Sequence, residues 1–168
     1  MDINKYTQKS QEALLAAQNL GVRLGHPAVD VEHLLLALCQ QEDGLVPRLL
    51  QRMQRPADVV AAELRRELEK RPSVKGPGAE PGKVFLTPEL QQVLVDAETE
   101  AGKLKDEYVS VEHLVLSILK PGSKSAAQRI LTTLGITREA FLQTLTQVRG
   151  NQRVTSATPE GAYEALTR

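Results

Sequence analysis

Cysteine and aromatic residues are scarce in this sequence of 168 residues. The one cysteine, Cys39, excludes an intramolecular disulfide, and such sparse cysteine fits a cytosolic compartment. Aromatic residues make up 3% of the chain and tryptophan is absent, which leaves too few rings for a surface that stacks nucleic-acid bases. The net charge is +0, with 21 basic and 21 acidic side chains, so no basic field for nucleic acid is expected.

Long apolar runs are also missing, which argues against a membrane protein. No run approaches the roughly 20 residues that a transmembrane helix needs, and residues 1–5 lack the apolar stretch of a signal peptide. Hydrophobic residues are 41% and charged residues 25% of the chain, the balance of an ordinary soluble globule. We therefore expect a cytoplasmic protein without membrane contact.

The sequence contains an internal repeat. The tetrapeptide VEHL occurs at residues 31–34 and again at 111–114, an offset of 80. With that offset held, residues 7–38 align on residues 87–118 without a gap, and 11 of the 32 pairs are identical. A repeat on this scale indicates two copies of one structural unit. We expect repeat one over residues 1–71, a joining segment over 72–86 and repeat two over 87–149.

Each repeat is predicted to hold four helices. Apolar and small residues recur at i, i+3, i+4 and i+7, and no stretch alternates long enough for a strand. The predicted helices cover residues 7–24, 30–38, 45–53 and 57–70, and then 87–104, 110–119, 123–134 and 138–149. Their expected N-caps are Thr7, Asp30, Thr87, Ser110 and Thr137. The predicted fold is all-α, a pseudo-twofold bundle of about eight helices.

Two segments fall outside this pattern. Residues 72–83 hold three prolines and three glycines, which predicts a surface loop that is mobile and open to proteolysis. Residues 150–162 are polar and lack periodicity, so residues 150–168 are predicted to be a linker that leaves the domain at residue 149 toward a module that this chain lacks.

The candidate motifs for catalysis or cofactor binding each lack a residue or a spacing that the motif requires. Residues 76–83 resemble a phosphate-binding loop, but five residues rather than four separate the glycines, and Val84 stands where Ser or Thr would ligate magnesium. His26, His33 and His113 lack the local ligand pairs of a zinc site, so half-buried packing histidines are expected. Cys39 is expected to be a small buried hydrophobe. We predict no enzymatic activity, metal or cofactor for this chain, and a small hydrolase or metal enzyme is the disfavoured alternative.

The glutamate of each VEHL motif allows two interpretations. Glu32 and Glu112 follow the expected caps by two residues, where a carboxylate interacts favourably with the helix dipole. Alternatively they are recognition residues at the mouth of a groove between the two repeats. Such a groove, lined by Leu, Val and Ala and edged by Asp and Glu, would suit unfolded peptide. The repeats can cover each other's apolar faces, so the chain is expected to be a monomer.

Four sequence segments carry a family resemblance. They are LGHPAVDVEHLLLAL (24–38), QEDGLVPRLL (41–50), DEYVSVEHL (106–114) and VRGNQRVTSATPEGAYEAL (148–166). Together they resemble the double Clp-repeat domain at the N-terminus of Clp-type AAA+ chaperones, and within that family the ClpB-type disaggregases. The last segment is the specific one, because in ClpB-like chains it leads into the first ATPase module.

The resemblance implies a chaperone function that the residues alone do not establish. A ClpB-type protein is a stress-response ATPase that forms a homohexamer, uses ATP and magnesium in its two ATPase modules and works with the DnaK system. Its N-terminal domain recognises unfolded or aggregated polypeptide before threading. An alternative is the adaptor-binding domain of a protease-linked unfoldase such as ClpC or ClpA.

The resemblance also points to particular residues. Positions implicated in substrate engagement match Thr7, Asp106 and Glu112, and the apolar lining of the groove matches Leu94. Leu90 extends the same apolar face, and His113 stands where a groove leucine often follows the glutamate. We expect Asp106 and Glu112 at the rim of this groove.

Overall fold

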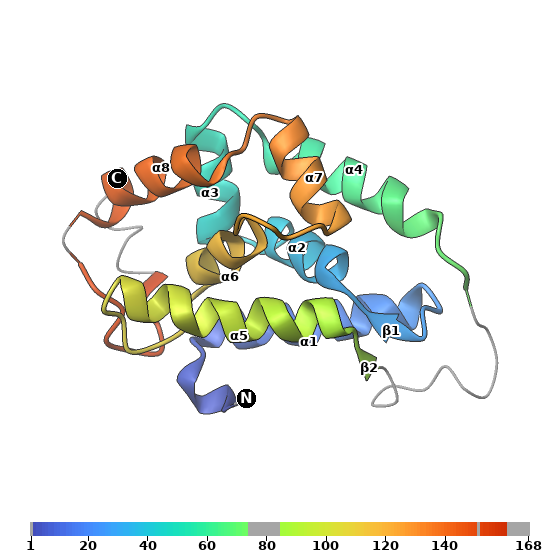
Figure 1. Cartoon of the computed structure of the whole chain (residues 1–168), viewed down its shortest axis with the longest axis horizontal. Coiled ribbons are helices and arrows are strands. Elements are labelled where there is room, and N and C mark those ends of the chain that lie inside the picture. The colour runs from blue at the N-terminus through green and yellow to red at the C-terminus, as the bar shows by residue number, and fades with distance from the viewer. Residues whose placement is uncertain (1, 74–84, 151, 161–168) are drawn as a thin grey trace.

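Eight α-helices form the fold within the residues that this computed structural model describes, which are 2–73, 85–150 and 152–160 (Figure 1). Repeat one holds α1 (Gln8–Arg23), α2 (Val31–Cys39), α3 (Leu45–Arg52) and α4 (Ala57–Glu69). Repeat two holds α5 (Pro88–Lys103), α6 (Val111–Ile118), α7 (Ala126–Thr133) and α8 (Arg138–Arg149). The predicted all-α fold is confirmed, and the largest shift in a boundary is the later start of α7.

Side-chain caps fix where several helices begin. Thr7 accepts a hydrogen bond from the Ser10 amide at 3.2 Å, and Thr87 accepts one from the Leu90 amide at 3.1 Å. Thr137 caps α8 in the same way. Each cap satisfies one of the amides that a helix leaves unpaired in its first turn, which stabilises the helix by about 1 kcal/mol. The predicted threonine caps are therefore confirmed.

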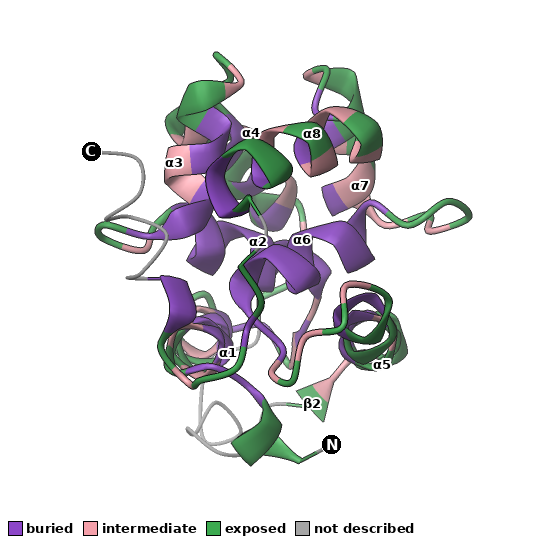
Figure 2. Cartoon of the chain, turned by 90° about the vertical axis from the view of Figure 1, so that its left-hand side faces the viewer, coloured by how far each residue is buried: buried purple, intermediate pink, exposed green. Residues whose placement is uncertain are grey.

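The second helix of each repeat lies at the centre of the molecule. Every residue of α2 and of α6 is buried, and Figure 2 shows both between α1 and α5 on one side and the remaining four helices on the other. Their sequences, VEHLLLALC and VEHLVLSI, have a polar Glu-His pair in the first turn and are mainly apolar on every side beyond it. A helix of that kind is stable in water only when other helices cover all its sides.

Short backbone pairings tie the repeats together reciprocally. Strand β1 (Ala28–Val29), just before α2, pairs in parallel with β2 (Phe85–Leu86), just before α5. At the equivalent place Tyr6, between the short 3-10 helix η1 (Ile3–Lys5) and α1, forms a parallel bridge with Val109. Each repeat thus holds the start of the other's first helix. Most of the predicted surface loop, residues 74–84, lies outside the described residues, so its mobility stays a prediction.

Candidate functional site

The histidine of each VEHL motif closes the N-terminus of its own helix. The Asp30 amide donates to Nδ1 of His33, and the Ser110 amide donates to Nδ1 of His113, both at 2.9 Å. This places histidine in the part that Glu or Gln plays in a capping box. Both rings are completely buried, so the predicted half-buried position is wrong. The hydrogen bond from the backbone amide explains the burial, because it holds the ring against the first turn of the helix.

Because Nδ1 accepts a hydrogen bond from a backbone amide in both motifs, Nε2 carries the ring proton and points inward. Nε2 of His33 lies 2.8 Å from Nδ1 of His26, and Nε2 of His113 lies 2.7 Å from Oδ2 of Asp106. His26 and Asp106 occupy equivalent positions in the two repeats. Repeat one therefore places a neutral partner beside its histidine, whereas repeat two places an acid.

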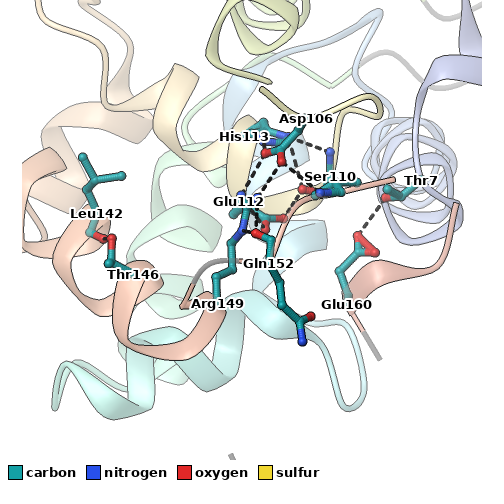
Figure 3. Close-up of polar contacts among 11 residues, drawn as sticks. Thr7, Asp106, Ser110, Glu112, His113, Leu142, Thr146, Arg149, Gln152 and Glu160 are labelled. Carbon is teal, nitrogen blue, oxygen red and sulfur yellow. Dashed lines mark hydrogen bonds and ion pairs between the residues drawn. The ribbon is translucent and has the colours of Figure 1, made fainter. Parts of the chain in front are cut away.

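Asp106 is the centre of a buried polar cluster (Figure 3). Its carboxylate accepts hydrogen bonds from both terminal nitrogens of Arg149, at 2.8 and 2.5 Å, and from the Val154 amide at 2.9 Å. Burial alone would raise the pKa of Asp106, but the hydrogen bonds from His113 and Arg149, together with the Arg149 charge, hold it at about 2. The carboxylate is therefore ionised, and it joins the loop before α6 to the end of α8.

Glu112, Ser110 and Thr7 extend the cluster toward the start of α1. The Ser110 hydroxyl donates to Glu112, and a terminal nitrogen of Arg149 lies 3.7 Å from Oε2 of Glu112. The Thr7 hydroxyl donates to Oε2 of Glu160 at 2.7 Å. The cluster consists of Thr7, Asp106, Ser110, Glu112, His113, Arg149 and Glu160, and it joins α1, α6 and α8 to the segment that follows α8.

The structure brings four of the six predicted site residues together. Thr7, Asp106, Glu112 and His113 belong to the buried polar cluster, whereas Leu90 and Leu94 lie on the inner face of α5 in the hydrophobic core. All six side chains are buried, so the expected exposed rim at Asp106 and Glu112 is wrong. Tertiary packing covers this corner with Arg149 and with residues 152–160.

Arg149 and Glu160 were not identified from the sequence. Both lie in the segment that carried the resemblance to ClpB-like chains, but no periodic pattern marks them as buried. Residues 152–160, predicted to be part of a linker, pack on the domain: the Gln8 amide donates to the Ala157 carbonyl at 2.9 Å, and the Glu107 amide to the Val154 carbonyl at 2.8 Å.

Glu32 acts across the repeat boundary. Its carboxylate pairs with Arg71, and its Oε2 accepts a hydrogen bond at 2.9 Å from the amide of Ala127, in the first turn of α7. The side chain is buried and is not at the mouth of a groove. Of the two interpretations offered for this glutamate, a structural role at helix N-termini fits its position, and the helix that it caps belongs to the other repeat.

Exposed apolar side chains occur on the outer faces of α1 and α5. Leu15 is 60% exposed, and its equivalent in repeat two, Val95, is 56% exposed. Ile3 is 41% exposed and, with Leu15 and polar residues of α1, lines a hollow of about 460 Å³. Figure 2 places α1 and α5 at the same end of the molecule, opposite α4 and α8. Within the described ranges, Leu24, Val59 and Phe85 are the other large apolar side chains that are exposed.

Within the described ranges, no group of three or more His, Cys, Asp and Glu side chains could hold a metal ion. Among the helices of those ranges, none is long and apolar enough to cross a bilayer.

A pseudo-twofold helical domain with a reciprocal tie between its repeats and a buried polar cluster at one corner defines a repeat-built all-α domain. The chain belongs to the Clp repeat (R) N-terminal domain family, whose profile matches residues 5–134. Its curated relatives include the "Chaperone protein ClpB" of Nitratidesulfovibrio vulgaris, which is 53% identical over 168 residues, and that of Bacillus cereus, which is 46% identical over the same length. Each alignment covers 100% of this chain and 19% of the relative.

Solved structures agree on the fold. The Hsp104 N-terminal domain from Candida albicans matches with a TM-score of 0.78 at 22% identity, covering 92% of this chain and 98% of that one. The N-terminal domain of ClpV1 from E. coli matches with a TM-score of 0.71 at 20% identity, covering 88% of each chain. The fold, the family match and the ClpB relatives together place the chain among Clp N-terminal domains of the ClpB/Hsp104 type. It spans about a fifth of the length of the curated relatives that it matches.

Proposed function

We propose that this chain is the substrate-recognition domain of an ATP-dependent disaggregase, and that it binds unfolded or aggregated polypeptide before ATPase modules elsewhere thread it. The similarity to ClpB chaperones over the whole chain is the observation that carries this proposal. The proposal includes a cytoplasmic homohexamer that uses ATP and magnesium and cooperates with the DnaK system. The ClpC/ClpA-like alternative has weaker support, because the N-terminal domain of ClpD from Arabidopsis thaliana matches at 18% identity and so supports only a shared fold.

Exposed apolar side chains are the proposed contacts. Unfolded polypeptide differs from folded protein in presenting apolar side chains, and these gain free energy when they are removed from water. Among the described residues, Ile3 and Leu15 flank the hollow on α1, and Val95 takes the equivalent place on α5. This surface is small, so binding should be weak and reversible, as a domain that hands substrate onward requires.

The six residues predicted as site residues are buried, and we propose that they act on binding by supporting the fold. Leu94 is buried, and its carbonyl accepts a 3.4 Å hydrogen bond from the hydroxyl of Tyr6. Thr7 caps the helix that carries Leu15. We propose that these residues hold α1 and α5 in position and that their substitution weakens substrate binding through the fold.

A binding assay with a permanently unfolded protein tests the proposal. Fluorescently labelled, reduced and carboxymethylated α-lactalbumin would be titrated with the chain and with the double variant Leu15→Ser, Val95→Ser. The matched control is Val59→Ser, because Val59 is also exposed but lies on α4 at the opposite end. We expect the double variant to bind at least about fivefold more weakly, with an unchanged melting temperature. Equal binding by the double variant and the native chain would contradict the proposed surface, and so would an equal loss in the control.

A further inference from the structure

The two repeats differ in the residue that precedes their second helix, which is Asp30 in repeat one and Ser110 in repeat two. In repeat one, Oδ1 of Asp30 accepts the Val31 amide at 2.8 Å and the Thr87 hydroxyl at 2.8 Å. One carboxylate thus joins the start of α2 to the start of α5. The equivalent of Asp30 in repeat two is Ser110, and the equivalent of Thr87 is Thr7. A serine hydroxyl offers a single oxygen, so the corresponding donors in repeat two need another acceptor.

Glu160 supplies that acceptor. The Thr7 hydroxyl donates to its Oε2 at 2.7 Å, and the Val111 backbone amide faces the same carboxyl group and lowers its pKa. These two donors are the equivalents of the Thr87 hydroxyl and the Val31 amide. Glu160 therefore does for repeat two what Asp30 does for repeat one, although it lies 50 residues beyond Ser110 in the chain. Its side chain is buried, as a carboxylate built into the fold would be.

Backbone hydrogen bonds hold the rest of the segment. The Ala157 carbonyl accepts the Gln8 amide, and Val154 both accepts the Glu107 amide and donates to Asp106. Gln8 is the first residue of α1, so its amide has no acceptor within the helix. Residues 152–160 thus cover donors that the domain would otherwise leave to water.

We propose that residues 152–160 are a releasable latch, in which Glu160 occupies the carboxylate position that Ser110 leaves vacant and thereby fixes how the chain leaves the domain. Release of Glu160 frees the segment from α1 and from the loop before α6. The domain can then rotate about the segment that follows α8. The latch concerns the chain's own exit segment and does not rest on polypeptide binding by α1 and α5.

The surroundings of Glu160 make the latch sensitive to pH. Oε1 of Glu160 and Oε2 of Glu112 are both buried, and neither has a hydrogen-bond partner among the described residues. Burial first, and then the charge of Glu112, raise the pKa of Glu160 to about 7, against the opposing hydrogen bonds from Thr7 and Val111.

The other charged and titratable groups of this corner are paired with each other. His113 of α6 and Arg149 of α8 both bind Asp106, and Arg149 also lies beside Glu112. The contacts from α1 come from the neutral Thr7 and Gln8. Glu160 is therefore the group whose protonation state changes when the segment docks.

The sign of the pH effect follows from linkage. The docked segment keeps a proton on Glu160 up to a pH of about 7, whereas a released glutamate loses it near pH 4.5. Docking therefore takes up a proton between these values, and the latch weakens by up to about tenfold for each pH unit of rise within that window. It is strongest in acid and weakest above neutrality.

Amide hydrogen exchange in the chain of 168 residues, measured by NMR, tests the latch. The reporters are the amides of Gln8 and Glu107, whose acceptors are in the latch, and the reference is the amide of Thr87, whose acceptor is Val29. In Glu160→Ala we expect the two reporters to exchange at least about tenfold faster, with Thr87 unchanged within about twofold. The matched control, Thr155→Ala, shortens an exposed side chain in the same segment and should change none of the three.

A second variant keeps the test independent of any damage caused by removing Glu160. Ser110→Asp gives repeat two the local carboxylate of repeat one, so it should displace Glu160 and speed exchange at Gln8 and Glu107 while the domain stays folded. In Glu160→Gln the amide oxygen still accepts the same bonds without titrating. Protection of the reporters, corrected for intrinsic exchange, should fall by about tenfold or more from pH 5 to pH 8 in the native chain and stay level in this variant.

The latch is overturned if Gln8 and Glu107 stay protected in both Glu160→Ala and Ser110→Asp. It is also overturned if Thr87 loses protection together with them in both variants, because the segment would then be part of the core. The same pH dependence in the native chain and in Glu160→Gln would remove the role of the Glu160 proton.

Discussion

Buried histidines make the stability of this domain depend on pH at the scale of single residues. Burial first, and then the neighbouring His26 and Arg71, lower the pKa of His33 to about 4 from an ordinary value of 6.5. As the pH falls through this range, the unfolded chain takes up a proton that the folded chain cannot. Stability is therefore fully present above pH 6.5 and declines toward pH 4, by at most about 3 kcal/mol.

Urea unfolding at pH 7 and pH 4.5 checks this prediction with His33→Gln. Glutamine can accept the Asp30 amide as the third residue of a capping box, but it does not titrate. The loss of unfolding free energy on acidification should be smaller in this variant than in the native chain. An equal loss would show that other groups cause the acid sensitivity.

Adjacent residues of α5 provide a second test at the residue scale. Leu94 is buried and Val95 is 56% exposed. Leu94→Ala should lower the free energy of unfolding by about 2–5 kcal/mol through lost burial and a cavity, whereas Val95→Ala should change it by less than about 0.5 kcal/mol. Chemical denaturation of both variants measures the difference. A small effect of Leu94→Ala would place that side chain in an open groove after all.

The sequence could predict individual caps but not the buried polar cluster. Thr7, Ser110 and Thr137 were identifiable because a cap depends on residues within one turn of the chain. Asp106 and Arg149 meet only in the folded molecule, because they lie 43 positions apart in the chain. A resemblance to a family can mark Asp106 as important, but it cannot say that the side chain is buried or what covers it.

At the scale of elements, Glu32 links helices of different repeats. It pairs with Arg71 after α4 and caps α7 through the amide of Ala127. Glu32→Ala should cost about 2–3 kcal/mol, because it leaves the buried Ala127 amide without its acceptor and Arg71 with Asp30 as its remaining partner. The control is Glu63→Ala, which breaks a surface pair with Arg66 and should cost at most about 1 kcal/mol. Equal losses of stability in thermal melts of the two variants would show that Glu32 stabilises the domain no more than a surface ion pair does.

Helix positions were the most predictable elements. All eight helices follow from 3.6-residue periodicity, caps and glycine or proline breaks, which are local signals. The paired strands β1 and β2 were not predictable, because two residues show no alternation and their partners lie 57 positions apart. Their pairing follows from the reciprocal docking of the repeats, which no local pattern encodes.

At the scale of the whole molecule, the repeats cover each other. The apolar helices α2 and α6 are enclosed by the other elements of the same chain, and the net charge is +0. The exposed apolar residues on α1 and α5 are too few for a stable dimer interface. Sedimentation equilibrium at micromolar concentration should therefore show a monomer. A dominant dimer would mean that α1 and α5 pair between chains.

The proposed function depends most on where an unfolded polypeptide touches this domain. An NMR titration of the isotope-labelled chain with reduced, carboxymethylated α-lactalbumin would map that contact directly. The account predicts shifts that cluster at Ile3, Leu15 and Val95, with smaller ones along α1 and α5, and little change on α4 and α8. Shifts that cluster on α4 and α8, or no shifts at millimolar polypeptide, would contradict it.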